Sequence, residues 1–269
     1  MILGRNENAE KIIKSKDRVK QHGEVFTPKH IVSDMISLPG MNEAIKEFET
    51  TVLEPACGEG IFIVEILKKR LKRVKEECKK DLTCYENLAL LSLTTLYGIE
   101  LLEDNAQKCV INIFETFSGD YNNFAISIDK KIKKKVLDSA KTIITANIVQ
   151  GNFLTKLTTE DKPIIFSEWR VIKQKKLVKY LQIERTEFTL EEIIKEENHN
   201  SGNICRKTEN EKSVQLAFFD LFDAQDVLPR IEEKKPKVVK YKYKAVKLVN
   251  VYKEEMEEVS DEGGNLKKN

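Results

Sequence analysis

The chain carries at residues 54–60 the stretch Glu54-Pro55-Ala56-Cys57-Gly58-Glu59-Gly60. A short run, Thr51-Val52-Leu53, precedes it, and a long pattern of apolar residues at helical spacing begins near Ile61. This order is typical of a strand, a glycine turn and a helix. Glycines in such a turn let backbone amides approach a ligand at the helix N-terminus, and a carboxylate at the end of the strand can accept hydrogen bonds from a cationic group.

Strand-like and helix-like patterns alternate after this stretch. Residues 61–78 and 102–117 have apolar residues at every third or fourth position, which predicts two amphipathic helices. Short apolar runs end near residue 99 and recur at 148–149 and 164–166, which predicts further strands. This alternation favours a parallel sheet with crossover helices. The fold class that we expect is therefore α/β, with a Rossmann-like doubly wound, mostly parallel sheet.

Other segments predict local features. Residues 119–135 are rich in asparagine, lysine and aspartate, so we expect an inserted loop there, and residues 173–186 are expected to form a hairpin or an irregular extension. Thr27-Pro28 fits the cap and first turn of a helix. Thr189-Leu190-Glu191-Glu192 fits a capping box, which predicts a helix that begins there.

Composition limits the classes of function. Charged residues make up 33% of the 269 residues, but the net charge is only +2, so the distribution of charge matters more than its sum. The five cysteines and three histidines lack paired spacing, so we expect neither a metal site nor a disulfide framework. No apolar run reaches the roughly 18 residues that span a bilayer, and the N-terminus is polar, so we expect a cytoplasmic protein without a membrane partner.

The stretch at 54–60 resembles the S-adenosylmethionine loop of adenine-N6 DNA methyltransferases. Three further motifs of that family occur in family order. Gly23-Glu24-Val25-Phe26-Thr27-Pro28 is similar to the segment that precedes the loop, Tyr97-Gly98-Ile99-Glu100 to the second strand, and Gln150-Gly151-Asn152-Phe153-Leu154 to the third motif. Four motifs in order are far more specific than a lone glycine pattern. The resemblance implies the sheet of S-adenosylmethionine-dependent methyltransferases, with a small C-terminal extension.

The resemblance also implies a cofactor site. Glu54 would meet the amino group of S-adenosylmethionine directly or through water, and Glu100 would accept hydrogen bonds from both ribose hydroxyls. Asn152 stands where the family usually has an aspartate for the adenine amine, so this contact would lack a charge. The alternative is that the glycines only turn a strand into a helix and that Glu100 is solvated. The cofactor-binding residues implied are Phe26, Thr27, Glu54, Ala56, Gly58, Gly60, Glu100, Asn152 and Phe153.

One family motif is missing. Adenine-N6 methyltransferases carry Asn/Asp/Ser-Pro-Pro-aromatic at the end of the fourth strand, where it binds the amine and stacks on the flipped base. This chain has no Pro-Pro; Ser167-Glu168-Trp169 follows the expected strand instead. Trp169 could stack on a base, with Ser167 or Glu168 accepting from the amine. The alternative, which we favour, is that Trp169 packs against the sheet and Glu168 is solvated.

The resemblance implies an S-adenosylmethionine-dependent DNA (adenine-N6) methyltransferase of restriction-modification or phage type, truncated or degenerate. The alternative is a catalytically inactive module that binds the cofactor or DNA, or a partner subunit of a restriction or phage system. We expect four parts: an N-terminal arm at 1–22, the methyltransferase-like domain at 23–200, a basic extension at 201–253 and an acidic flexible tail at 254–269.

Two segments of the extension suggest partners. Every second residue from Lys240 to Lys244 is a lysine, and Tyr241, Tyr243 and Ala245 stand between and after them. This period of two predicts a strand with one lysine-covered face. That face could contact DNA phosphates, or it could protect an exposed edge strand. Gln215-Leu216-Ala217-Phe218-Phe219 resembles the peptide that binds the bacterial sliding clamp, although the same residues could form a helix that packs on the core.

Overall fold

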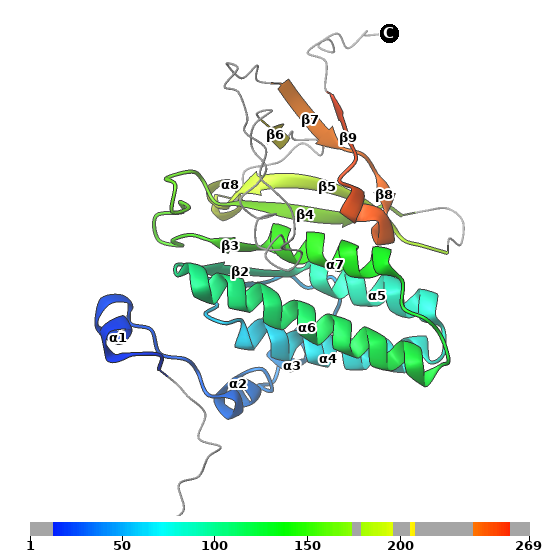
Figure 1. The fold of residues 1–269 in the computed structure, drawn as a ribbon, viewed down its shortest axis with the longest axis horizontal. Coiled ribbons are helices and arrows are strands. Elements are labelled where there is room, and N and C mark those ends of the chain that lie inside the picture. Colours follow the sequence, from blue (N-terminus) through cyan, green and yellow to red (C-terminus); the bar gives the residue numbers. More distant parts are fainter. Residues whose placement is uncertain (1–12, 174–178, 196–204, 208–238, 259–269) are drawn as a thin grey trace, which may run out of the picture.

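The computed structural model describes residues 13–173, 179–195, 205–207 and 239–258 (Figure 1). Its central element is a parallel sheet of β1 (Val52–Glu54), β2 (Leu96–Glu100) and β3 (Ile148–Gln150), in the order β1-β2-β3. The parallel pairing confirms the sequence prediction for these three strands. Because the strands are parallel, their last residues, Glu54, Glu100 and Gln150, all lie at the carboxyl-terminal end of the sheet.

Four helices connect these strands. Helices α4 (Ile61–Cys78) and α5 (Leu82–Thr94) join β1 to β2, and α6 (Glu103–Ser127) and α7 (Lys134–Asn147) join β2 to β3 (Figure 1). Their apolar faces form the main core together with one side of the sheet. Gly98 on β2 faces this core, because a Cβ atom there would lie only 2.9 Å from the Ile63 side chain. The crossover arrangement is therefore built from the amphipathic patterns of the sequence.

The strand after β3 does not extend the parallel sheet. The prediction for residues 164–166 is wrong in this respect, since β4 (Ile165–Val171) pairs antiparallel with β5 (Gln182–Thr189), which pairs with β8 (Val246–Lys247). Residues 151–164 contain turns and isolated bridges but no crossover helix, which a further parallel strand requires. The hairpin expected near 173–186 is confirmed. In the described residues the parallel sheet has three strands, and the doubly wound arrangement remains a prediction.

The inserted loop expected at 119–135 is largely helical. Helix α6 continues to Ser127, and α7 begins at Lys134. The apolar face continues because Tyr121 and Phe124 are buried, and the Tyr121 hydroxyl donates to the carboxylate of the fully buried Glu86 at 2.7 Å. These long-range contacts outweigh the polar composition of the segment.

The N-terminal residues form short helices. These are α1 (Lys16–His22), α2 (Lys29–Met35) and α3 (Met41–Ala44). The prediction that Thr27 caps α2 is wrong, since Pro28 occupies the N-cap without a side-chain hydrogen bond. The capping box at Thr189 and Glu192 is confirmed, and it opens α8 (Leu190–Ile194).

The C-terminal residues contribute to both the core and a small sheet. The 3-10 helix η1 (Leu248–Lys253) buries its apolar side chains in the main core. Strands β6 (Cys205–Lys207), β7 (Val239–Tyr243) and β9 (Met256–Glu258) form an antiparallel sheet in the order β6-β7-β9. The interpretation that the lysines protect an edge strand is therefore wrong, because β7 is central. Of the acidic residues expected in a flexible tail, Glu257 and Glu258 belong to β9, and Glu254 follows η1 and pairs with Arg185 at 2.8 Å.

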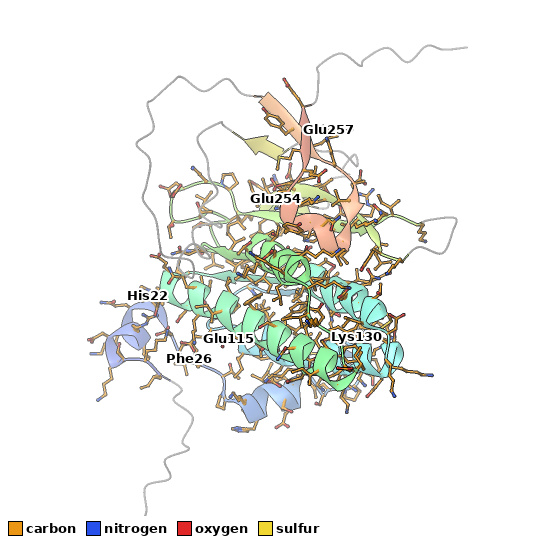
Figure 2. All side chains as sticks on the ribbon, turned by 45° about the vertical axis from the view of Figure 1, so that its right-hand side comes forward. His22, Phe26, Glu115, Lys130, Glu254 and Glu257 are labelled. Atoms are coloured by element: carbon orange, nitrogen blue, oxygen red, sulfur yellow. A yellow bond between two sulfur atoms is a disulfide. The ribbon has the colours of Figure 1, made fainter. Side chains whose placement is uncertain are left out.

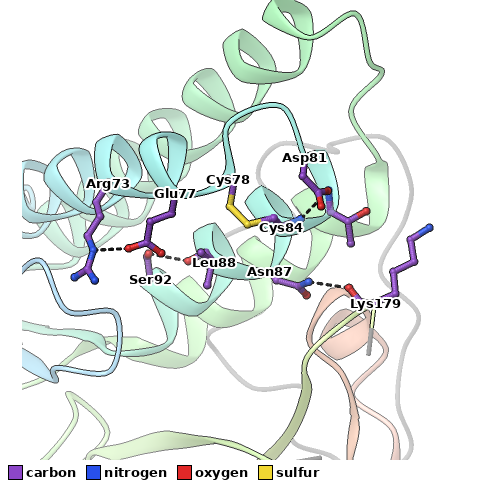
Figure 3. Close-up of a disulfide and its surroundings, with 10 residues drawn as sticks. Arg73, Glu77, Cys78, Asp81, Cys84, Asn87, Leu88, Ser92 and Lys179 are labelled. Carbon is purple, nitrogen blue, oxygen red and sulfur yellow. Dashed lines mark hydrogen bonds and ion pairs between the residues drawn. A yellow bond between two sulfur atoms is a disulfide. The ribbon is translucent and has the colours of Figure 1, made fainter. Parts of the chain in front are cut away.

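A disulfide joins Cys78 and Cys84, which the cysteine spacing did not predict (Figure 3). It links the end of α4 to the first turn of α5, where the Asp81 side chain accepts from the backbone amides of Thr83 and Cys84. The two cysteines meet because the chain reverses between two antiparallel helices. In the described residues no helix is long and apolar enough to cross a membrane, and no cluster of His, Cys, Asp and Glu has metal-binding geometry.

Candidate functional site

A pocket of about 1040 Å³ lies at the carboxyl ends of β1 and β2. This is where open α/β sheets bind their ligands, and the volume is at the upper end of the range for small-molecule sites. The walls come from the loop at 54–59, the N-terminal segment at 22–29, the first turns of α4, one face of α6 and residues 151–154. Of the residues predicted to bind a cofactor, all but Gly60 line it: Phe26, Thr27, Glu54, Ala56, Gly58, Glu100, Asn152 and Phe153.

The loop at 54–60 is a tight turn that only glycine fits at two positions. Gly58 and Gly60 have φ angles of 55° and 83°, in the left-handed region that side chains disfavour. A Cβ atom on Gly60 would lie 2.6 Å from the Cys109 sulfur of α6, so this residue supports the loop from behind rather than from within the pocket. A Cβ atom on Gly58 would touch the Phe26 ring at 3.4 Å. Phe26, which Figure 2 labels on the N-terminal segment, therefore packs directly on the loop.

Glu100 is buried, with 7% of its surface exposed, so the alternative that it is solvated is wrong. Its carboxylate accepts from the Gly58 amide at 2.8 Å, the Leu102 amide at 3.0 Å and the Asn105 side chain at 3.3 Å. An ionised carboxylate offers about four acceptor positions. One position is therefore open for a ligand hydroxyl, and a second becomes available if the long Asn105 contact gives way. The same anion holds the loop and faces the pocket.

Glu54 ends β1, where the loop begins, and is half-buried at the wall of the pocket. Burial raises the pKa of this carboxyl above its ordinary value, because desolvation disfavours the charged form, and a hydrogen bond from the Ala56 amide partly opposes the shift. A cationic group in the pocket would compensate for the desolvation. Glu54 is therefore suited to bind a cation, and Glu100 to bind donors.

A network of ion pairs fastens the N-terminal segment over the pocket. Arg18 of α1 donates to Glu24 at 2.7 Å and to Asp104 of α6 at 2.9 Å, and Glu24 accepts from Asn105 at 2.6 Å. Hydrogen bonds from Arg18 lower the pKa of Glu24, and they lower that of Asp104 to about 2. Sequence reasoning missed this network because Asp104 lies 86 positions from Arg18 and Asn105 lies 81 positions from Glu24, although Glu24 itself is part of a recognised motif.

Asn152 is less available than predicted. Its side-chain oxygen accepts from the backbone amides of Leu154 at 2.9 Å and Thr155 at 3.4 Å, so both lone pairs already have donors. Asn152 therefore shapes the turn that follows β3. Phe153 is partly buried and packs against a second apolar cluster, while Leu154 is exposed at the mouth of the pocket. The buried residues of this cluster are Ile99, Val149, Ile164, Phe166 and Leu190.

The three candidate catalytic residues lie on β4 and do not line the pocket. Trp169 is buried in the core, its indole nitrogen donates to Asn147 at 2.9 Å, and the Arg185 guanidinium lies over its ring at 4.9 Å. Ser167 accepts from the Arg185 side chain at 2.9 Å. Glu168 is on the surface, where it pairs with Arg170 at 3.3 Å. Their placement agrees with the alternative that Trp169 packs against the sheet.

The lysine-rich segment lies apart from the pocket. Lys240 and Lys242 belong to β7 and Lys244 follows it, and the described side chains of Lys242 and Lys244 do not line the pocket. Lys242 pairs with Glu257 of β9 at 2.8 Å, so part of the positive charge is neutralised within the small sheet. The clamp-like peptide at 215–219 lies outside the described residues.

The chain matches the family model for N-6 DNA methylases over residues 10–202. The match spans the N-terminal segment, the loop, Glu54, Glu100 and the hairpin of β4 and β5. Comparisons with the curated proteins and with the solved structures found no match.

Proposed function

Since the chain belongs to the N-6 DNA methylase family, we propose that it binds S-adenosylmethionine in the pocket at the ends of β1 and β2 and serves adenine-N6 methylation of DNA. S-adenosylmethionine supplies a methyl group activated by its sulfonium. The observation that supports the proposal is the placement of Glu54 and Glu100 in one pocket at the ends of adjacent strands, with Glu54 at the start of the glycine loop and Glu100 bound to the loop's Gly58 amide.

The residues fit this cofactor in charge and in hydrogen bonding. Glu54 would hold the cationic amino group, because a cation relieves its desolvation. Glu100 would accept from a ribose hydroxyl with the acceptor position that the Gly58, Leu102 and Asn105 donors leave open. Phe26 would close the site from the N-terminal segment.

A second candidate function is a cofactor-binding subunit that does not methylate DNA alone. It is favoured by one observation: Ser167, Glu168 and Trp169 lie away from the pocket, so in the part of the chain that the structure describes they bring no amine acceptor or base-stacking ring to it. Three expectations from the sequence stay proposals. The protein would belong to a restriction-modification or phage system, it would contact DNA phosphates through Lys240, Lys242 and Lys244, and it would bind a sliding clamp through residues 215–219.

A methyl-transfer assay distinguishes the two candidates. The purified chain is incubated with tritiated S-adenosylmethionine and duplex DNA that contains adenine in varied sequence contexts. Label in DNA that disappears in Glu100→Gln supports the enzyme. Cofactor binding without label on any of the DNAs supports the subunit.

We expect Trp169→Phe to leave the result of this methyl-transfer assay unchanged, because the Trp169 ring is in the core. A specific loss of methyl transfer with normal folding would contradict the placement of this ring.

Cofactor affinity is expected to fall as the pH is lowered through the pKa of Glu54. Without ligand, the Glu54 carboxyl has a raised pKa, and a bound cation would lower that pKa again. Between the pKa of the unliganded protein and that of the complex, binding must therefore release a proton. Affinity is therefore independent of pH well above that pKa and decreases below it. Calorimetry in two buffers of different ionisation enthalpy, from about pH 7 to about pH 5, measures the proton release. Glu54→Gln should abolish it, whereas equal release in both proteins would place the cation elsewhere.

A further inference from the structure

A hollow of about 680 Å³ on the surface is lined by lysines. It lies where the turn from α4 to α5 meets the segment that joins α6 to α7. Half of its eight lining residues are lysines: Lys80, Lys130, Lys131 and Lys133. The one acid among the eight is Asp81, whose side chain is already engaged in capping α5. The hollow is therefore strongly positive.

A second group of lysines surrounds the ring of Tyr180, next to the hollow. The ammonium groups of Lys133, Lys135, Lys179 and Lys247 lie between 5.1 and 6.0 Å from the centroid of this ring. Lys133 belongs to both groups, so the two form one continuous patch of seven lysines, which we call the basic surface. No two of the four ammonium groups around Tyr180 are further apart than twice the longest of these distances.

Little of this positive charge is neutralised within the protein. Lys133 pairs with the carboxylate of Glu86 at 2.7 Å. The other six lysines of the basic surface form no ion pair with any residue that the structure describes. Like charges this close together repel one another, and the repulsion is relieved when an anion with several charges binds. The patch therefore favours a polyanionic partner.

The backbone under the basic surface is held in place without a ligand. Glu86 is fully buried, and it accepts from the Tyr121 hydroxyl at 2.7 Å as well as from Lys133. The same hydroxyl accepts from the Lys133 backbone amide at 3.1 Å, which fixes the segment before α7. On the other side, the disulfide fixes the α4–α5 turn, and Asn87 donates to the Lys179 carbonyl at 3.0 Å (Figure 3). A partner would therefore order lysine side chains but little backbone, which limits the entropy cost of binding.

The basic surface lies far from the cofactor pocket. Helix α4 begins at the glycine loop and ends at Cys78 after 18 residues, a rise of about 27 Å. Figure 2 labels Phe26 beside the pocket and Lys130 beyond the opposite end of α6. None of the seven lysines is among the residues that line the pocket. Any partner of the basic surface is therefore held at a place separate from the cofactor.

We propose that the basic surface binds the phosphate backbone of duplex DNA, as an anchor separate from the cofactor pocket. This inference rests on the proposed function, in which DNA is the substrate. Lysine is depleted in the interfaces between proteins, whereas interfaces with DNA are much more positively charged, so the composition favours DNA over an acidic protein. Lysine ammonium groups contact phosphates without reading bases, so this anchor would be independent of sequence.

The test measures how DNA affinity depends on salt. The full chain without cofactor is titrated into a fluorescein-labelled duplex that contains only G·C pairs, so no adenine is available to the pocket, and affinity is measured by fluorescence anisotropy at several salt concentrations. The variant combines Lys80→Gln, Lys130→Gln and Lys131→Gln. We expect its affinity to fall at least about tenfold at low salt, and the slope of log affinity against log salt to become shallower by about 2–3, because about one counterion is released for each phosphate contact.

The matched control combines Lys16→Gln, Lys20→Gln and Lys46→Gln. It removes the same net charge from exposed lysines in the first 50 residues, away from the basic surface. We expect the slope of the control to stay within about 0.5 of that of the unmodified chain. An unaltered slope in the basic-surface variant, or equal reductions in the variant and the control, overturns the inference.

A second measurement needs no variant. The unmodified chain is acetylated with a small reagent, with and without the G·C duplex, and the rates at single lysines are followed by mass spectrometry. DNA should slow the acetylation of Lys130 and Lys131 at least about threefold and leave that of Lys46 unchanged. Equal rates at Lys130 and Lys131 with and without saturating DNA would contradict the anchor, even if a variant fails to fold.

Two further results separate this inference from its alternatives. If a polyglutamate of the same charge binds as tightly as the duplex and loses as much affinity in the basic-surface variant, the surface takes acidic polypeptides and the inference is overturned. Affinity for S-adenosylmethionine, measured without DNA, should stay within about twofold in that variant. Absence of cofactor binding in the unmodified chain overturns the proposed function, and it leaves the salt dependence on the G·C duplex as a separate result.

Discussion

Arg70→Met is expected to lower the free energy of unfolding by about 3–5 kcal/mol, the largest effect that we expect for a single side chain. Arg70 is fully buried, and its guanidinium donates to the carbonyls of Ile45 at 2.8 Å and Ser92 at 2.9 Å, to that of Thr50, and to the Thr95 hydroxyl at 2.7 Å. Burial lowers its pKa to about 10. Methionine fills part of the volume but leaves these acceptors without donors.

The matched control is Arg73→Met, one turn further along α4. Arg73 lies at the surface, where it pairs with Glu47 and Glu77, both at 2.7 Å. Exposed pairs contribute about 0–1 kcal/mol, so this variant should stay close to the parent in chemical denaturation. A loss at Arg70 no greater than that at Arg73 would mean that the guanidinium does not hold the start of β1 to the end of α5.

Gly60→Ala is expected to cost about 3 kcal/mol of stability and to weaken cofactor binding at least about tenfold. The new Cβ atom would lie 2.6 Å from the Cys109 sulfur and 3.4 Å from the Cys109 Cα, so either the loop or α6 must move. The left-handed backbone adds strain of about 1–2 kcal/mol. Denaturation measures the first effect and calorimetry the second.

Two variants separate the contact from the backbone strain. Gly23 has φ 66° and ψ 21°, in the same left-handed region as Gly60 with 83° and 22°, and a Cβ atom there meets nothing within 4 Å. Gly23→Ala should therefore show the backbone strain alone in chemical denaturation. Gly60→Ala combined with Cys109→Ala should recover part of the loss, because the sulfur is gone. Equal losses of stability at Gly23 and Gly60 would contradict the close packing of the loop against α6.

The sequence predicted the parts of the site that are local in the chain. The loop, Glu54 and Glu100 were predicted because the turn and each acid are fixed by a few neighbouring residues at strand ends. The partners of Glu100 were not predicted, since the Gly58 amide reaches it from 42 positions away. Arg18 also pairs with Asp104 from 86 positions away, and charged residues alone do not indicate their partners.

The fold was predictable where periodicity continued without interruption. Helices α4 and α6 have apolar positions at regular spacing, so their existence was predicted, but Tyr121 and Phe124 extended α6 beyond the expected end. The direction of β4 could not be predicted from its apolar residues, because a buried parallel strand and an antiparallel strand share that composition. What decides its direction is the absence of a crossover helix between Gln150 and Ile165.

The most direct test of the cofactor site is a thermodynamic cycle on Glu100. S-adenosylhomocysteine and its 2′,3′-dideoxyribose analogue are titrated by calorimetry into the unmodified chain and into Glu100→Gln, with folding of both proteins checked by thermal denaturation. If Glu100 accepts from the ribose, the variant weakens S-adenosylhomocysteine by about tenfold but the analogue much less, a coupling of about 1 kcal/mol. Equal losses for both ligands would show that Glu100 holds the loop and never meets the ribose, which would contradict the site proposed for this chain.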